Sequence, residues 1–254
     1  MNLPKLSPHT FAFFLLAHPL FPGEADFQFP EGEKLEYSMK WAGIKVGNAT
    51  LERMQDTELD GTPCLHFNMT AKTYGVADKI YKVRDNIHSY TDLGLRNTLL
   101  YTKRQQEGKT DRDIRVTFDR QKQLATHHDF GQADPPLEIR EGLLDPLSVM
   151  YSLRNQEFKV GEPIHLPATD GKKVINIKVG VDGEEEIEVP AGTFQAYRIV
   201  PGTGELKGVF EKSKDSKIEI WMSKEKPHYP LKMKSKVIVG SFTGKLEKIR
   251  KPGE

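Results

Sequence analysis

Side chains able to perform acid–base chemistry gather in one stretch of the sequence. Arg84, Asp85 and His88 lie within an alternating run, and Asp85 shares its parity with the aliphatic residues of that run. In a strand its carboxylate would therefore point to the apolar side, where an unpaired charge costs several kcal/mol. We expect Asp85 to form a structural ion pair with Arg84, Arg154 or Arg198 rather than to act as a catalytic acid.

Candidate metal ligands and nucleophiles are few. His127, His128 and Asp129 are consecutive, but neighbours on a strand face opposite sides, so at most His127 and Asp129 could share one ion. The single cysteine, Cys64, excludes an intramolecular disulfide and any multi-cysteine metal centre. The sequence also lacks a nucleophile elbow, a phosphate-binding loop and a dinucleotide-binding glycine motif. We therefore expect no metal site, no cofactor and no catalytic residues, which favours a protein that is not an enzyme.

One segment has a helical period. Apolar residues recur at helical spacing across 142–155, and Leu147 belongs to this stripe. Asp145 followed by Pro146 is a strong start signal, because aspartate accepts backbone hydrogen bonds at the N-cap and proline suits the first helical position. The sequence predicts a main helix at about 146–155, with Asp145 as its cap and Arg154 as a polar contact between helix and sheet.

Most of the remaining chain alternates between polar and apolar residues, which is the pattern of half-buried strands. Ala42 and Gly43 suit a two-residue hairpin turn, and Gly47 marks a bulge in the strand that follows. The segment 75–82 predicts a second, shorter helical turn. Strands are expected at 35–41, 44–51, 65–71, 83–90, 99–105, 111–118, 164–166, 175–181, 187–189, 194–200, 218–222, 231–239 and 242–249.

These elements predict a mainly β fold, with a single large curved antiparallel sheet or open β-barrel and one main helix. No linker rich in proline or serine divides the strands, and the stretch 129–136 is the one plausible boundary. We therefore expect residues 26–254 to form a single all-β domain.

The composition limits the partners of the protein. Of its 254 residues, 37 are Lys or Arg and 36 are Asp or Glu, which leaves a formal net charge of +1. A protein without a strong positive field has little attraction for nucleic acid. The hydrophobic fraction of 37% is typical of a globular protein rather than of a disordered chain.

The first 25 residues have the features of an export signal. Lys5 precedes an apolar stretch at 11–17, and small residues at Gly23 and Ala25 place a signal-peptidase cut before Asp26. This stretch is too short to span a bilayer, so we do not expect the protein to be an integral membrane protein. The mature protein would be soluble in the periplasm or secreted. The alternative interpretation is a poorly ordered N-terminal tail of a cytosolic protein.

Large apolar side chains on the first and third strands share one face of the predicted sheet. They could line a pocket for an acyl chain, and ordinary core packing explains them equally well. The predicted helix would lie against or across this face, either as core or as a lid. The candidate ligand-binding residues are Tyr37, Met39, Trp41, Phe67, Met69 and, on the helix, Leu147.

Several short motifs follow one another along the chain: LEYSMKWAGIKVGNA at 35–49, YKVRD at 81–85, DPLSVMYSLR at 145–154, VPAGTF at 189–194, IW at 220–221, Pro230 and GSFT at 240–243. Their order resembles an exported bacterial family known as domain of unknown function 3108 (DUF3108). The resemblance covers nearly all of the chain from about 33 to 249. It implies a signal peptide, a curved antiparallel sheet wrapped near a helix and an envelope location, and it implies no established reaction.

Three functions remain open. The first is an envelope protein that binds a lipid or another hydrophobic small molecule on the concave face of its sheet. The second is an envelope assembly or scaffold protein with a packed interior, whose partner is another envelope protein. The third is a hydrolase, which requires Asp85, His88, His127 or Asp145 to converge in one cleft.

Overall fold

The computed structural model describes residues 29–202, 218–236 and 241–253, so the predicted export signal at 1–25 lies outside the described residues. Within these ranges the protein consists of strands and two helices. The elements are β1 (Lys34–Trp41), β2 (Ile44–Arg53), β3 (Thr57–Leu59), β4 (Thr62–Thr73), α1 (Gly75–Ile80), β5 (Val83–Thr91), β6 (Thr98–Glu107), β7 (Thr110–Asp119), β8 (Leu124–Asp129), β9 (Gln132–Ala133), β10 (Leu137–Glu138), α2 (Pro146–Arg154), β11 (Ile164–Thr169), β12 (Val174–Val189), β13 (Gly192–Pro201), β14 (Ile218–Ser223), β15 (Pro230–Lys236) and β16 (Ser241–Arg250).

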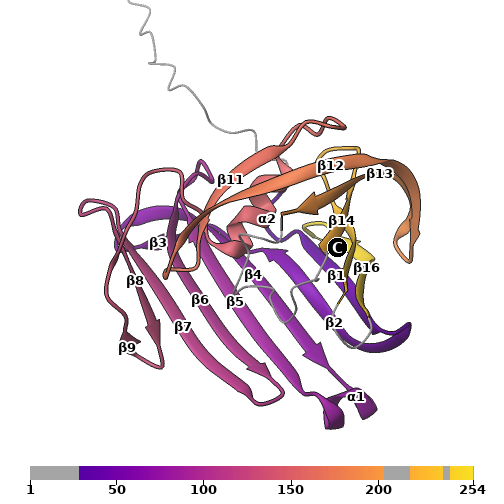
Figure 1. The fold of residues 1–254 in the computed structure, drawn as a ribbon, viewed down its shortest axis with the longest axis horizontal. Coiled ribbons are helices and arrows are strands. Elements are labelled where there is room, and N and C mark those ends of the chain that lie inside the picture. The colour runs from indigo at the N-terminus through magenta and orange to yellow at the C-terminus, as the bar shows by residue number, and fades with distance from the viewer. Residues whose placement is uncertain (1–28, 203–217, 237–240, 254) are drawn as a thin grey trace, which may run out of the picture.

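The strands form one antiparallel sheet that curves around α2 without closing (Figure 1). The order is β10-β8-β7-β6-β5-β4-β2-β1-β16-β15-β14-β13-β12-β11, with β3 paired to β4 and β9 to β8. The stretch 129–136, considered above as a boundary, lies within this sheet, because β9 and β10 both pair with β8. The predicted fold class, a large curved antiparallel sheet with one main helix, is confirmed.

Local sequence explains how β1 turns into β2 and bends. Ala42 and Gly43 both have positive φ, as the predicted two-residue turn requires. The β1–β2 register shifts between Met39 and Lys40, so a bulge lies beside Gly47 as expected. A Cβ atom at Gly47 would lie 2.3 Å from the carbonyl oxygen of Lys72, so the close approach of β4 excludes any side chain there.

The segment that precedes α2 bridges β6 to β11, the last strand in the order of the sheet. The backbone N–H of Thr98 in β6 donates to Leu143 O at 3.0 Å. On the other side, Leu144 N donates to Pro167 O at 3.3 Å and Thr169 N donates to Leu144 O at 2.9 Å, both in β11. These bonds hold β6 and β11 around the start of the helix and give the open sheet its barrel-like shape.

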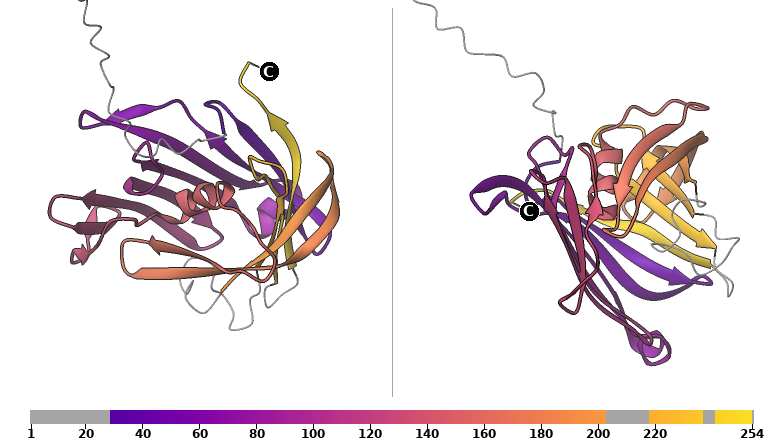
Figure 2. Two further views of the ribbon diagram at one scale, coloured as in Figure 1. Left: turned by 90° about the horizontal axis from the view of Figure 1, so that it is seen from above. Right: turned by 60° about the vertical axis from the view of Figure 1, so that its left-hand side comes forward.

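Helix α2 is enclosed between the two halves of the sheet (Figure 2). Leu147 and Tyr151 belong to a buried cluster with β4 to β8, where the Tyr151 ring stacks on Phe67 at a centroid distance of 3.9 Å. Val149 and Leu153 belong to a second cluster with β11 to β14. Because both sides of the helix are packed, α2 is part of the core rather than a lid.

Helix α1 lies at the opposite end of the sheet from α2 (Figures 1 and 2). It connects β4 to β5, contacts β2 and has no buried residue. The second helical turn predicted at 75–82 therefore forms, but it projects from the molecule instead of joining the core.

Candidate functional site

The concave face of β4 to β7 divides into two halves according to its distance from α2. Next to the helix the side chains are fully buried, as Phe67, Tyr101 and Val116 show. Farther along the same strands the apolar side chains are half-buried. These are Met69, Ile87 and Ile114, and the register places them in one row across the sheet together with Lys103. We call this row, with half-buried Met39 of β1 and the polar groups described next, the distal half of the concave face.

Polar side chains lie at the outer margin of the distal half. Asp85 of β5 is two residues beyond Ile87, and Glu107 of β6 is close enough to share a hydrogen bond with it. The pKa of Asp85 is raised to about 7, mainly by burial and secondly by that hydrogen bond. Burial also lowers the pKa of Lys103. An apolar row followed by a partly buried polar margin can contact the two ends of an amphiphilic molecule.

The prediction that Asp85 forms an ion pair with Arg84, Arg154 or Arg198 is wrong, because each of these arginines binds another carboxylate. Arg84 follows the opposite face of β5 and binds Asp78, with its Nη1 atom 2.7 Å from Oδ1. Arg154 binds another carboxylate at the far end of the concave face, and Arg198 pairs with Glu219 on β14. The physical reason is strand alternation, because the nearest arginine in sequence is on the wrong side of the sheet. The half-buried carboxyl of Asp85 has a raised pKa instead, so it is mostly protonated below about pH 7.

The proton held by Asp85 predicts a pH-dependent stability. Between about pH 4 and pH 7 the unfolded chain loses this proton while the folded chain keeps it, so stability falls as pH rises. Asp85→Asn removes this loss and should raise the free energy of unfolding at pH 8 by about 1 kcal/mol, a value reduced for solvent screening of a half-buried group. Near pH 4 the variant and the wild type should be equally stable. Urea unfolding at both pH values measures this, and an equal effect at both would contradict it.

The six candidate ligand-binding residues occupy different environments. Phe67 and Leu147 are buried in the cluster around α2, and Tyr37 is buried in a third cluster beneath β12 and β13. Met39 and Met69 are half-buried in the distal half. Trp41 is also half-buried and stacks on Phe242 of β16, with 6.4 Å between the ring centroids. The structure therefore brings Met39 and Met69 to the distal half and places Tyr37, Phe67 and Leu147 in the core.

Asp145 is fully buried at the start of α2 and caps it. Its Oδ1 atom accepts hydrogen bonds from Leu147 N at 2.8 Å and Ser148 N at 3.1 Å. Its Oδ2 atom accepts from the hydroxyl groups of Thr98, at 2.7 Å, and of Ser89. The carboxylate thus joins the helix to β5 and β6, which is a structural role.

Arg154, at the other end of α2, forms a buried ion pair with Glu33. Arg154 Nη2 donates to Glu33 Oε2 at 3.0 Å, Nη1 lies 2.7 Å from Oε1, and Arg154 Nε donates to His228 O at 3.1 Å. The guanidinium carbon also lies 4.8 Å from the ring centroid of Phe29. Sequence reasoning missed Glu33 and Phe29, because both precede the first strand and carry no local signal of burial.

The four residues that a hydrolase would require do not meet in one place. His88 lies on the outer face of β5, opposite to Asp85, and its Nδ1 atom is 2.9 Å from Nε2 of His66. His127 of β8 is buried with Nδ1 2.9 Å from an Asp134 oxygen, and Asp145 caps the helix. Within the described ranges no group of three or more His, Cys, Asp or Glu side chains could hold a metal ion.

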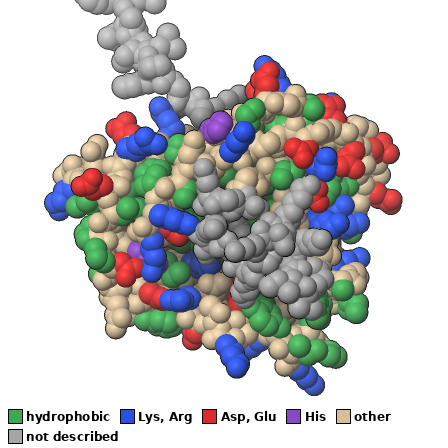
Figure 3. Space-filling model, viewed as in Figure 1, with side chains coloured by type: hydrophobic (Ala, Val, Ile, Leu, Met, Phe, Trp, Pro, Cys, Tyr) green, Lys and Arg blue, Asp and Glu red, His purple; other side chains and the backbone are tan. Residues whose placement is uncertain are grey.

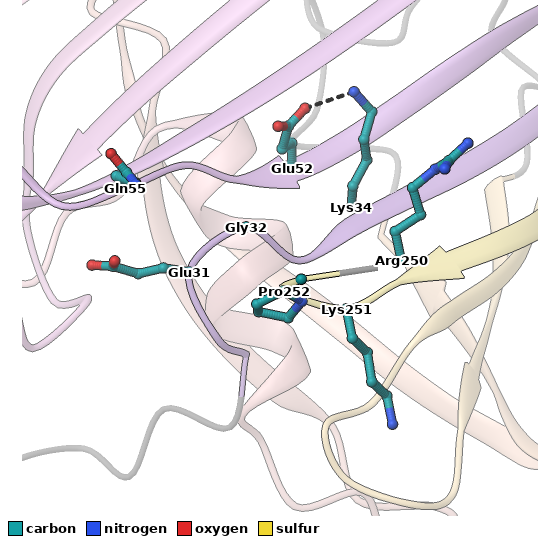
Figure 4. A pocket seen from close by; sticks show the side chains of 9 residues that line it. Glu31, Gly32, Lys34, Glu52, Gln55, Arg250, Lys251 and Pro252 are labelled. Atoms are coloured by element: carbon teal, nitrogen blue, oxygen red, sulfur yellow. Dashed lines mark ion pairs between the residues drawn. The ribbon is translucent and has the colours of Figure 1, made fainter.

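A shallow polar depression of about 340 Å³ lies between the start of β1 and the end of β16 (Figure 4). Three of its charged side chains, those of Lys34, Glu52 and Arg250, are already paired, since Lys34 Nζ lies 2.9 Å from Glu52 and Arg250 binds Glu36. We therefore regard the distal half of the concave face, rather than this depression, as the candidate site.

Comparison with known proteins supports the fold and the resemblance seen in the sequence. The family described as "Protein of unknown function (DUF3108)" matches residues 36–247, which confirms that resemblance. No curated protein matches the chain. Among the described residues, no helix has the length and apolar character needed to cross a bilayer.

Solved structures that are similar to this chain include three with the following likeness. The first is a β-barrel-like protein of the family DUF1849 from Brucella abortus, with a TM-score of 0.57, 11% identity and coverage of 88% of this chain and 98% of the other. A protein described as exported, with a YmcC-like fold, from Bacteroides fragilis has a TM-score of 0.35, 11% identity and coverage of 89% and 98%. A protein described as a lipoprotein from Parabacteroides distasonis has a TM-score of 0.35, 14% identity and coverage of 88% and 98%. The first of these supports a shared barrel-like fold.

Proposed function

This chain belongs to the DUF3108 family of unknown function, and we propose that it is an exported envelope protein that binds an amphiphile on the distal half of its concave face. The apolar chain of the ligand would lie along the row of Met69, Ile87 and Ile114. Its polar end would lie between Lys103, which stands in that row beside Ile87, and the margin formed by Asp85 and Glu107. In this proposal residues 26–254 act as one domain.

The observation that carries the proposal is the change in burial along single strands. On β5, Ser89 is fully buried beneath α2, whereas Ile87 and Asp85 on the same face are half-buried. A packed scaffold would be expected to cover such a row of large apolar side chains as completely as it covers Phe67. Half-buried methionine and isoleucine beside a charged margin are typical of a ligand-binding surface.

Ligand binding can be tested with a fluorescent fatty acid and a pair of neighbouring variants. Ile87→Asp places a charge in the apolar row and should weaken uptake at least about ten-fold, because a carboxylate beside an acyl chain must be desolvated. Asn86→Asp adds the same charge one residue away on the outer face and should leave uptake unchanged. Native mass spectrometry of protein purified without detergent should show a bound lipid.

The same assay separates ligand binding from a scaffold role. Leu147→Ala should cost roughly 2–5 kcal/mol of stability without changing uptake, because Leu147 belongs to the core around α2. If the wild-type protein takes up no fatty acid and carries no lipid, the proposal fails and the alternative, an envelope assembly protein with a packed interior, is favoured.

Export is tested separately. The protein from fractionated cells should lie outside the cytoplasm and begin at Asp26, because the small residues at 23 and 25 suit signal peptidase. Mass spectrometry of the intact protein measures this. A cytoplasmic protein with an uncut N-terminus would disprove export while leaving the ligand-binding test unaffected.

A further inference from the structure

Exposed apolar side chains gather at the end of the sheet that carries α1. Val76 and Ile80 of α1 are 73% and 72% exposed, and Ile44 at the start of β2 is 70% exposed. Tyr74 and Tyr81, which flank the helix, are each 40% exposed. The hydrogen bond from Tyr74 N to Val46 O, 3.1 Å long, holds the helix beside β2. We call these five residues the α1 tip. A cluster of this kind on a soluble domain indicates an interaction surface.

Lysines surround the α1 tip. Lys72 is the penultimate residue of β4, Lys79 lies in α1 and Lys82 follows it, and in the described part of the chain their amines form no ion pair. The carboxylate within α1, Asp78, is neutralised by Arg84, whose Nη1 and Nη2 atoms lie 2.7 Å and 3.0 Å from it. Figure 3 shows apolar and basic side chains side by side at the lower edge of the molecule, where Figure 1 places α1.

The tip is held in a defined shape. The Tyr81 ring lies against Gly108 of the β6–β7 turn, where a Cβ atom would be 2.5 Å from the ring. Gly108 N donates to Lys82 O at 2.8 Å, and the Thr73 hydroxyl donates to Asp78 at 2.6 Å. Two adjacent hairpins therefore support the helix. Its exposed apolar side chains thus lie on a fixed element of the structure.

We propose that the α1 tip docks on an anionic lipid surface. Isoleucine and valine would enter the boundary between headgroups and acyl chains, the two tyrosines would lie at headgroup level, and the lysines would contact lipid phosphates. The positive charge around the apolar side chains favours an anionic bilayer over a neutral one. This contact would not span the membrane.

The position of the tip relates it to the proposed ligand site, although neither proposal requires the other. Strand β5 begins directly after α1, and its first residues on the concave side are Val83 and Asp85. A protein docked through α1 would therefore have the margin of the distal half next to the bilayer, while α2 lies at the remote end of the sheet.

The test is co-sedimentation of the full chain with vesicles of phosphatidylglycerol mixed with phosphatidylcholine, compared with vesicles of phosphatidylcholine alone. The wild type should bind the anionic vesicles, and binding should weaken in high salt. The double variant Val76→Asp, Ile80→Asp should lose binding. Lys79→Ala and Lys82→Ala should each weaken binding about five-fold, since one basic residue near an anionic surface contributes about that factor.

Leu93→Asp is the matched control, because Leu93 is 50% exposed in the turn at the other end of β5. It should bind vesicles like the wild type. All variants contain the same residues 1–28, so a difference in vesicle binding between variants cannot come from that segment. Thermal unfolding checks that the variants remain folded. The proposal is overturned if the wild type ignores anionic vesicles or if the double variant binds as well as Leu93→Asp. It is also overturned if light scattering shows a dimer that Val76→Asp dissociates, because the tip would then join two copies of the chain.

Discussion

Replacing Asp145 by alanine is expected to lower the free energy of unfolding by about 4–6 kcal/mol, among the largest effects of any single change in this protein. The carboxylate accepts two backbone N–H groups of α2 and the hydroxyl groups of Ser89 and Thr98. All of these groups are buried, so no water replaces the lost acceptor. The expected loss of stability has two sources, the loss of the helix cap and the several buried donors that are left without an acceptor.

Urea unfolding followed by circular dichroism measures this loss. Ser89→Ala removes one of the donors and should cost only about 1–2 kcal/mol, which keeps the test informative if the alanine variant does not fold. Asp145→Asn should lie between the two, because an amide oxygen can still cap the helix. A loss below about 1 kcal/mol for Asp145→Ala would show that the helix is held by its apolar contacts alone.

Arg154→Met is expected to cost about 3–5 kcal/mol, because it leaves the buried Glu33 carboxylate without its partner. Methionine keeps most of the side-chain volume, so the loss reports the charge rather than a cavity. The guanidinium also contacts the rings of Phe29 and Tyr229, so the variant weakens the packing of the segment before β1 against α2.

The double variant Glu33→Leu, Arg154→Met provides the control. Removing both charges should restore at least half of the lost stability, since neither side chain is then an unpaired buried ion. Unfolding free energies of the two single variants and the double variant form a mutant cycle. If the double variant is as unstable as the sum of the single variants, the pair does not interact as the geometry indicates.

These two polar centres hold both ends of α2, which has a consequence for ligand access. Asp145 ties the start of the helix to β5 and β6, and Arg154 ties its end to Glu33 and His228. A helix anchored at both ends is unlike a lid that opens. In the proposed function a ligand would therefore enter from the α1 end of the concave face, where the apolar row is half-buried.

Features that depend on neighbouring residues could be predicted from the sequence. Asp145 and Pro146 are adjacent and predict the start of α2 by themselves, and the structure has the helix at Pro146–Arg154. Ala42 and Gly43 predict the first hairpin for the same local reason. Alternation of polar and apolar residues predicts most strands and their faces, because the side-chain period of a strand is a property of its own backbone.

Features that depend on distant partners were decided only by the tertiary structure. Arg154 and Glu33 are 121 residues apart, and nothing near either residue indicates the other. Asp85 faces Glu107 rather than an arginine because of the pairing of β5 with β6, and Phe67 and Met69 differ in burial because α2 covers one and not the other. The alternating pattern tells which face a side chain occupies. What lies opposite that face depends on strand order, bulges and the position of the helix, which are set by the packing of the whole chain.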